Sequence, residues 1–239
     1  MNDLVLSTSS ISEYLRCPHR YLLSHVYRRK GRQSVAAAIG QAVHAGVEAL
    51  HHAQPALDAL RGSFAVEMIA VPTAERDADP DALADAERML GVYEREVLPT
   101  FRPVLVEAPF TIRVDGVIVS GTIDAADEDV RDTKTTSGKT INGRKPHFDP
   151  ANYDLQLSLY AMGYKALRGT WPKRLLLDVL TRRGTYRQYE RPPKIGEALD
   201  VVGIVRDGIG REEFDPTGAL NGSCNWCPYI EVCPHATTG

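Results

Sequence analysis

The sequence lacks any hydrophobic run long enough to cross a membrane. A membrane-spanning helix needs about 18 or more consecutive apolar residues, and no such stretch occurs in the 239 residues. The first twenty residues also lack the basic segment followed by an apolar core that marks a secretory signal. We therefore expect a cytoplasmic protein without a membrane partner.

An excess of positive charge is also missing. The chain has 28 Lys and Arg residues against 31 Asp and Glu residues, a net charge of −3. This balance excludes a uniformly basic nucleic-acid-binding protein, but it permits a local basic groove. Basic clusters occur at residues 28–32, 139–145 and 182–194. No G-x4-G-K-[ST] loop is present, so the chain has no helicase motif of its own.

Cysteine is scarce, and its four positions are informative. Three cysteines lie in a C-x2-C-x5-C pattern near the C-terminus and one lies near the N-terminus: Cys224, Cys227, Cys233 and Cys17. Two disulfides fit poorly, because a cytoplasmic chain is kept reduced and a chain of this size can build its own core. Four thiolates on one metal centre fit better. Zinc usually takes two close cysteine pairs, so the spacing favours a four-iron cluster over zinc, with plain buried thiols as the third alternative.

Hydrophobic periodicity and turn residues predict the order of helices and strands. The spacing Ser10-x-x-Glu13 is that of a capping box, so it predicts a short first helix with Cys17 on or beside it. Further helices are expected at 33–53, twice within 55–99, at 150–168 and at 194–209. Strands are expected at 104–114 and 116–126, joined by Asp115-Gly116, then at 130–135, and as a second hairpin over 173–193. Residues 136–149 are expected to form a polar loop.

This order predicts an α/β fold in which helices pack against a mixed sheet. We expect one domain over 1–239. Its N-terminal part, 1–103, is mainly helical, its core spans 104–209, and its cysteine-rich tail, 210–239, comes together with Cys17.

A group of acidic residues and a lysine follows the first predicted hairpin. Asp124 lies near the end of one strand, and Asp132 and Lys134 lie two residues apart on the next, so the last two point to the same face. Two carboxylates on adjacent strands suit Mg²⁺ or Mn²⁺, and a nearby lysine can orient or deprotonate a water. The alternative is an ordinary solvated strand edge.

Two helical features add to this group. His44 lies in an apolar-periodic helix, where the alternative is a packed core histidine. Gln156 and Tyr160 lie four residues apart and therefore share one helix face, although a tyrosine at this spacing is also typical of a core.

Together these residues resemble a known family. The set of His44, Glu107, G-x-x-D at 121–124, D-x-K at 132–134 and Q-x-x-x-Y at 156–160 resembles the RecB-type branch of the PD-(D/E)XK nucleases. The cysteine pattern, with Cys17 followed by proline, is similar to the iron–sulfur subgroup of that branch. This subgroup includes the AddB nuclease domain and the CRISPR-associated RecB-like exonucleases. The resemblance runs from about residue 7 to 235 and implies a restriction-endonuclease-like fold with a C-terminal iron–sulfur tail.

The resemblance also implies roles for individual residues. Those implied to hold the divalent metal are His44, Asp124, Asp132 and the main-chain carbonyl of Thr133. Lys134 would be the catalytic lysine, and Gln156 and Tyr160 would steady the site and the DNA. The ligands of the 4Fe–4S cluster would be Cys17, Cys224, Cys227 and Cys233. Asp132 stands where the family more commonly has glutamate.

We therefore expect a Mg²⁺- or Mn²⁺-dependent deoxyribonuclease, an exonuclease that acts on single-stranded DNA or DNA ends. The resemblance points to recombination, repair or CRISPR adaptation, with a helicase or a CRISPR-adaptation protein as a separate partner. Stacking of bases on Tyr160 or Trp226 would favour single strands. The alternative is a catalytically inactive or partner-dependent DNA-binding iron–sulfur protein.

Overall fold

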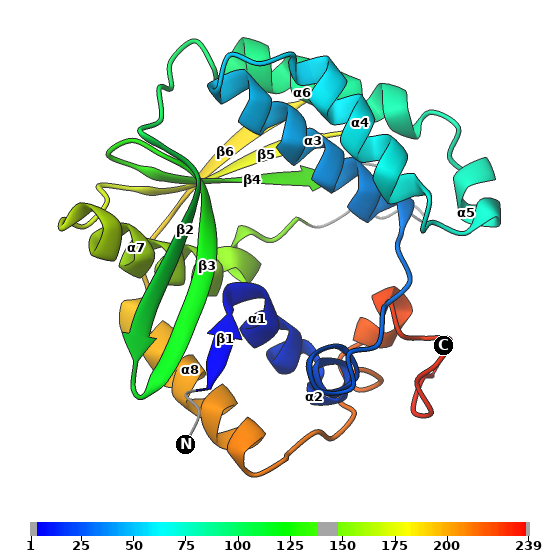
Figure 1. Cartoon of the computed structure of the whole chain (residues 1–239), viewed down its shortest axis with the longest axis vertical. Coiled ribbons are helices and arrows are strands. Elements are labelled where there is room, and N and C mark those ends of the chain that lie inside the picture. The colour runs from blue at the N-terminus through cyan, green and yellow to red at the C-terminus, as the bar shows by residue number, and fades with distance from the viewer. Residues whose placement is uncertain (1–3, 138–147, 238–239) are drawn as a thin grey trace.

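The computed structural model describes residues 4–137 and 148–237 (Figure 1). Most of the expected polar loop, including Lys139, Arg144 and Lys145, lies outside these residues. The helices are α1 (Thr8–Arg16), α2 (Pro18–Tyr21), the π-helical turn η1 (Leu22–Val26), α3 (Val35–His51), α4 (Ala56–Met68), α5 (Thr73–Asp77), α6 (Ala82–Glu96), the 3-10 turn η2 (Pro150–Tyr153), α7 (Asp154–Arg168), α8 (Ile195–Gly210) and the 3-10 turn η3 (Ser223–Trp226). The strands are β1 (Val5–Ser7), β2 (Leu105–Val114), β3 (Val117–Ala126), β4 (Val130–Thr136), β5 (Leu175–Thr181) and β6 (Tyr186–Arg191).

These strands form one mixed sheet. Its order is β1-β3-β4-β5-β6, and β2 pairs with β3. The β1–β3 and β4–β5 pairs are parallel, and the remaining pairs are antiparallel. The mixed α/β fold and both predicted hairpins are therefore confirmed.

One edge of β3 is divided between two strands. β2 runs along the other edge, from Leu105↔Ala126 to Val114↔Val117. On the divided edge, β1 pairs with residues 118–120 and β4 pairs only with residues 125 and 126. In the described part of the chain, no strand pairs with residues 121–124 on this edge. We call this unpaired stretch the β3 gap.

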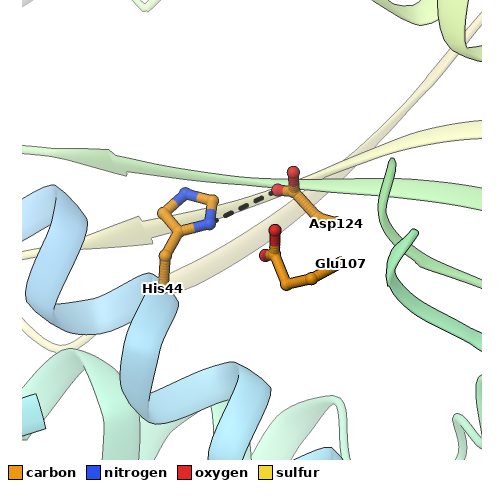
Figure 2. A group of neighbouring side chains, drawn as sticks. All are labelled: His44, Glu107 and Asp124. Carbon is orange, nitrogen blue, oxygen red and sulfur yellow. Dashed lines mark ion pairs between the residues drawn. The ribbon is translucent and has the colours of Figure 1, made fainter. Parts of the chain in front are cut away.

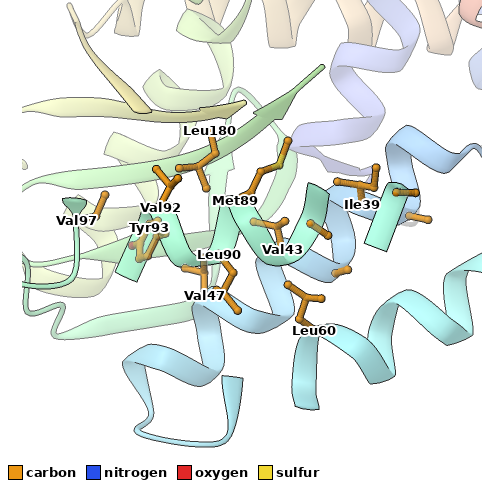
Figure 3. Packing of buried hydrophobic residues seen from close by; sticks show 14 of the residues in the cluster. Ile39, Val43, Val47, Leu60, Met89, Leu90, Val92, Tyr93, Val97 and Leu180 are labelled. Carbon is orange, nitrogen blue, oxygen red and sulfur yellow. The ribbon is translucent and has the colours of Figure 1, made fainter. Parts of the chain in front are cut away.

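Helices cover both faces of the sheet. The apolar residues of α3, α4 and α6 form one core, which reaches the sheet at Ala125 and Leu180 (Figure 3). α7 packs on the opposite face, where its buried residues meet those of β3, β4 and β5. α1 and α8 bury their apolar residues beside it, against β1 and the end of the β2–β3 hairpin. None of the described helices combines the length and apolar character needed to cross a membrane.

Two elements differ from the sequence expectation. The three-residue strand β1 and the short helix α5 were not expected, because neither is long enough to show a period. The first helix also begins earlier than predicted. Its capping box joins Ser7 and Ser10, with the Ser10 amide 3.0 Å from Ser7 Oγ. Glu13 instead accepts hydrogen bonds from Arg20 and Ser24.

The C-terminal tail packs against the segment that follows α1. Asn221 Nδ2 donates to the Arg16 carbonyl at 2.8 Å, and the Arg32 amide donates to the Pro228 carbonyl at 2.8 Å. Tyr229 Oη donates to the Arg29 carbonyl at 3.2 Å. In Figure 1 the tail accordingly lies beside α2. Residues 16–32 and 221–229, about two hundred positions apart in the sequence, are therefore neighbours.

Close packing of α7 on the sheet depends on glycine. A Cβ at Gly163 would overlap the Phe110 ring, whereas a Cβ at Gly91, on α6, would meet nothing within 4 Å. We predict that Gly163→Ala lowers the free energy of unfolding by about 1–3 kcal/mol, because the ring cannot yield without moving its neighbours. Gly91→Ala should raise it by about 0.5–1 kcal/mol. Urea denaturation of both variants tests this, and equal effects would contradict it.

Candidate active site

Asp124 lies at the β3 gap, where β3 and β4 separate. The last paired residues of these strands are Ala125 and Arg131. Beyond them the Thr133 amide donates to Asp124 Oδ2 at 3.0 Å. The Asp124 side chain thus accepts the hydrogen bond that a main-chain carbonyl would accept in a continuous sheet. This hydrogen bond fixes the carboxylate at the β3 gap. Its side chain is 15% exposed.

Two side chains from other elements approach Asp124. His44 comes from α3 and Glu107 from β2, and Figure 2 shows both turned toward the carboxylate. His44 Nδ1 lies 3.5 Å from Asp124 Oδ2. One ligand atom from each of the three residues lies within 4.8 Å of the others. An imidazole and two carboxylates at this spacing can hold a divalent cation.

Glu107 has an unusual backbone as well as a raised pKa. Its φ angle is +43°, in the left-handed region that non-glycine residues rarely adopt. The pairs Val106↔Ala125 and Ala108↔Ile123 keep one register on either side of it, so Glu107 stands opposite Asp124. Burial, followed by the charge of Asp124, raises the pKa of Glu107 to about 7. The motif contained Glu107, but sequence reasoning gave it no ligand role, because a strand pattern does not reveal a local backbone turn.

Asp132 and Lys134 meet on the face covered by α7. Lys134 Nζ lies 2.8 Å from Asp132 Oδ2 and donates to Oδ1 at 3.0 Å. Gln156 Nε2, from α7, also donates to Oδ1, at 3.1 Å. The structure thus brings together three of the residues that the spacing placed on shared faces. The Thr133 carbonyl as a metal ligand stays a prediction.

Burial and mutual attraction shift the pKa values of Asp132 and Lys134. Asp132 is fully buried, and this burial raises the pKa of its carboxyl, although Lys134 opposes the shift. Burial lowers the pKa of Lys134, but the Asp132 and Asp124 carboxylates outweigh it, so the net shift is upward. Among the described residues, the charged neighbour of Asp132 Oδ2 is Lys134 Nζ, at 2.8 Å, and no hydrogen bond satisfies this oxygen. A buried carboxylate oxygen that is held only by an ion pair, near Asp124, fits a site that receives a cation.

Tyr160 holds Gln156 in place through a hydrogen bond. Its hydroxyl accepts a hydrogen bond from Gln156 Nε2 at 2.8 Å, and its ring packs edge-on against Phe110. Because only 5% of Tyr160 is exposed, a base cannot stack on it, and that expectation was wrong. Trp226 is 80% exposed. The predicted pair on α7 therefore orients Asp132 through Gln156.

A large cavity opens in front of these residues. Its volume is about 1070 Å³, and it is lined by Ser120 and by residues 121, 122 and 124 of the β3 gap. Lys134, Gln156 and Tyr160 also line it, together with residues of α1 and η1. A polymer segment can therefore reach the Asp124 carboxylate and the Lys134 ammonium from the same space.

The four cysteines lie together at a second, smaller cavity. Cys17 meets Cys224, Cys227 and Cys233 there, and all four are free thiols. Burial raises the pKa of the Cys227 thiol, and the neighbouring Cys17 and Cys233 add to the shift. The structure thus brings the distant cysteine to the other three, and Arg20 lines both cavities.

Comparison with known proteins identifies the family. The sequence profile of the PD-(D/E)XK nuclease superfamily matches residues 5–234. The chain belongs to the PD-(D/E)XK nuclease superfamily. The match covers β1, the D-x-K motif of β4 and the cysteine-rich tail, so the candidate site described above lies inside it. Nucleases of this superfamily use divalent metals, which agrees with the group formed by His44, Glu107 and Asp124.

Solved structures with the same fold are distant in sequence. A crystal structure of a protein named SSO0001 aligns with a TM-score of 0.53 and 15% identity over 100% of this chain and 89% of that chain. A crystal structure of a "Putative exonuclease" from Eubacterium rectale aligns with a TM-score of 0.58 and 15% identity over 87% and 79% of the two chains. At this identity the likeness concerns the fold. No curated protein sequence matches the chain.

The metal group can be tested without a nuclease assay. We predict that Glu107→Gln weakens Mn²⁺ binding by about 10–100-fold, because one of three converging ligands loses its charge. Isothermal titration calorimetry at pH 8, above the pKa of about 7, measures this. Glu94→Gln, an exposed residue of α6, is the matched control. Equal affinities of the two variants would contradict the assignment.

Proposed function

We propose that this chain is a divalent-metal-dependent deoxyribonuclease that cuts single-stranded DNA or DNA ends, as an exonuclease. The observation that carries the proposal is the meeting of Asp124, Asp132 and Lys134 at the β3 gap, where Asp124 and Lys134 line a cavity of about 1070 Å³ and Asp132 is buried behind Lys134. Two carboxylates and an ammonium beside one open cavity are the groups that metal-assisted phosphodiester hydrolysis needs.

Each residue has a distinct task in this proposal. The cation ligands are His44, Glu107 and Asp124, with Asp132 nearby, whose Oδ2 lies 2.8 Å from Lys134 Nζ. A divalent cation held there would polarise the scissile phosphate and lower the pKa of a bound water. Lys134 stays protonated, because two carboxylates raise its pKa, so it orients the attacking water and stabilises the charge that develops at phosphorus.

Gln156 and Tyr160 act as positioning residues. Gln156 Nε2 fixes Asp132 Oδ1 at 3.1 Å, which leaves Oδ2 turned to the site. Tyr160, anchored against Phe110, fixes Gln156 in turn. The complete set argues against the alternative of a catalytically inactive DNA-binding protein, since an inactive site has no physical need for a buried ion pair of this cost.

The four cysteines are the ligands of a structural 4Fe–4S cluster in this proposal. Four thiolates on one zinc ion, at about 2.3 Å each, lie close together. Zinc usually takes its cysteines as two close pairs, whereas here three cysteines are close in sequence and the fourth comes from the other end to the same cavity. This pattern supports a cluster, in which each thiolate binds a separate iron.

The biological setting follows from the same resemblance. Recombination, repair or CRISPR adaptation would supply DNA ends to such an enzyme, and a helicase or a CRISPR-adaptation protein would be its partner. Assays of the chain alone and with such partners separate an independent nuclease from a partner-dependent one.

Catalysis should fail when the ammonium is removed. We predict that Lys134→Met lowers the rate of Mn²⁺-dependent cleavage of single-stranded DNA by at least about 100-fold, while the thermal melt and the iron content stay near those of wild type. Lys173→Met, which removes an exposed lysine paired with Glu128, is the control. Wild-type turnover by Lys134→Met would refute the role of this lysine.

The two ends of the cysteine site should be equally important. We predict that Cys17→Ser and Cys233→Ser both lose the broad absorbance near about 400 nm of a four-iron cluster, lose iron and melt at a lower temperature, because either change opens a coordination position. Ser223→Ala, at the same cavity, should keep both properties. A colourless wild-type protein with one zinc per chain would refute the cluster.

A further inference from the structure

α1 has two chemically different faces. Ile11 and Tyr14 are buried in the core beside β1. The opposite face carries Ser9, Ser12 and Arg16, at helical spacings of three and four residues, and all three line the large cavity that contains Asp124 and Lys134. The cavity is therefore lined both by the catalytic residues Asp124 and Lys134 and by a polar helix face.

Among the described residues of α1, α2 and η1 that line the cavity, the one carboxylate, Glu13, is paired with residues other than Arg16. Glu13 receives Arg20 Nε at 2.8 Å, Ser24 Oγ at 2.7 Å and His25 Nε2 at 2.9 Å. Arg20 and Glu13 thus neutralise each other. Arg16 is exposed, and no carboxylate pairs with its guanidinium in the described part of the chain. A free cation flanked by two serine hydroxyls faces the cavity.

An aromatic ring lies between this cation and the catalytic lysine. Lys134 Nζ lies 5.1 Å from the centre of the Tyr153 ring. Burial raises the pKa of Tyr153, and the nearby charges of Lys134 and Arg16 act against that shift. Lys134, Tyr153 and Arg16 therefore line the same cavity, with the Tyr153 ring close to Lys134 and within reach of the charge of Arg16. A strand whose scissile phosphate is at Lys134 would carry its neighbouring phosphate past Tyr153 toward Arg16.

The main chain of Arg16 is also held in place by the C-terminal tail. Its carbonyl accepts hydrogen bonds from Asn221 Nδ2 at 2.8 Å and Ser223 Oγ at 3.4 Å, both from the tail. The next residue is Cys17, at the cysteine cavity. A fixed main chain lowers the entropic cost of holding a ligand with a long side chain.

We propose that Arg16, with Ser9 and Ser12, binds a backbone phosphate of the DNA strand next to the phosphate that is cut. This inference rests on the proposed nuclease function and adds a binding site to it. The guanidinium matches a phosphate with two parallel N–H donors. The Ser9 hydroxyl, now 2.9 Å from Ser7 Oγ, and the Ser12 hydroxyl, which donates to the Thr8 carbonyl at 3.1 Å, would add further donors by rotating toward the phosphate. Contacts of this kind fix the register of the strand and carry no sequence preference.

Binding measured without cleavage tests the site. A fluorescent single-stranded oligonucleotide is titrated with the iron-loaded protein in EDTA over a series of salt concentrations. We expect Arg16→Gln to weaken binding about tenfold at low salt and to reduce the slope of log K against log salt by about 0.7, the share of one phosphate. Arg95→Gln, an exposed arginine of α6 paired with its neighbour Glu96, should change neither value.

Neutral methylphosphonate linkages locate the phosphate. In wild type, one such linkage adjacent to the cut position should weaken binding as much as Arg16→Gln does, and the same linkage should have no further effect on Arg16→Gln. Arg16→Lys should keep the salt slope but bind more weakly than wild type, because it lacks the paired donors. Full iron content in each variant shows that the cysteine site is intact.

The outcomes separate the two proposals. If wild type binds and cuts DNA while Arg16→Gln matches Arg95→Gln in affinity and salt slope, the Arg16 site is wrong and the nuclease assignment stands. Additive effects of the methylphosphonate and Arg16→Gln at every position would also overturn the Arg16 site. If wild type neither binds nor cuts DNA, both proposals fall.

Discussion

The β3 gap is the constraint on which the candidate site depends. β1 and β4 pair with the same edge of β3, but the pairing with β1 ends at Ser120 of β3 and the pairing with β4 begins only at Ala125 of β3. An unpaired strand edge inside a fold leaves main-chain groups and side chains facing open space. Here that space is the large cavity, and Asp124 stands at the point where β4 departs. Across this opening Asp124 accepts a hydrogen bond from the Thr133 amide. The same residue therefore connects β3 to β4 and presents a carboxylate to the cavity.

Negative charge concentrates around this opening from several elements. Glu107 comes from β2, Asp124 from β3 and Asp132 from β4, and burial with mutual repulsion raises the pKa of Glu107 and of Asp132. Lys134 compensates one carboxylate, and within residues 4–137 and 148–237 the other two have no lysine or arginine as an ion-pair partner, although His44 lies 3.5 Å from Asp124. An arrangement of this kind is costly when it stands alone. A divalent cation supplies the missing charge, so the electrostatics and the ligand geometry at His44 point to the same kind of occupant.

Local patterns predicted the parts of this fold that depend on neighbouring residues. The Asp115-Gly116 turn marked the β2–β3 hairpin, and the two-residue period of a strand placed Asp132 and Lys134 on one face. Long-range pairing was hidden, since β1 is too short to show a period and its partner lies more than a hundred residues away. The backbone turn that aims Glu107 at Asp124 leaves no mark in the alternation of β2. The family motif named most of the site residues, but it could not show that Tyr160 is buried beneath Gln156.

The C-terminal segment fixes the position of α1, which lines the cavity together with the catalytic residues. Tyr14 Oη donates to the Glu213 carbonyl at 2.7 Å, and Asn221 holds the Arg16 carbonyl, so α1 is fixed along its length by the C-terminal segment. The entropic cost of closing this loop grows only as about (3/2)RT ln n, so joining residues some two hundred apart costs little more than joining closer ones. Four cysteines that bind one centre at this junction would fix α1 relative to the β3 gap. In the proposed function, the cysteine site would then act on the cavity through the position of α1, without contributing a group to the chemistry.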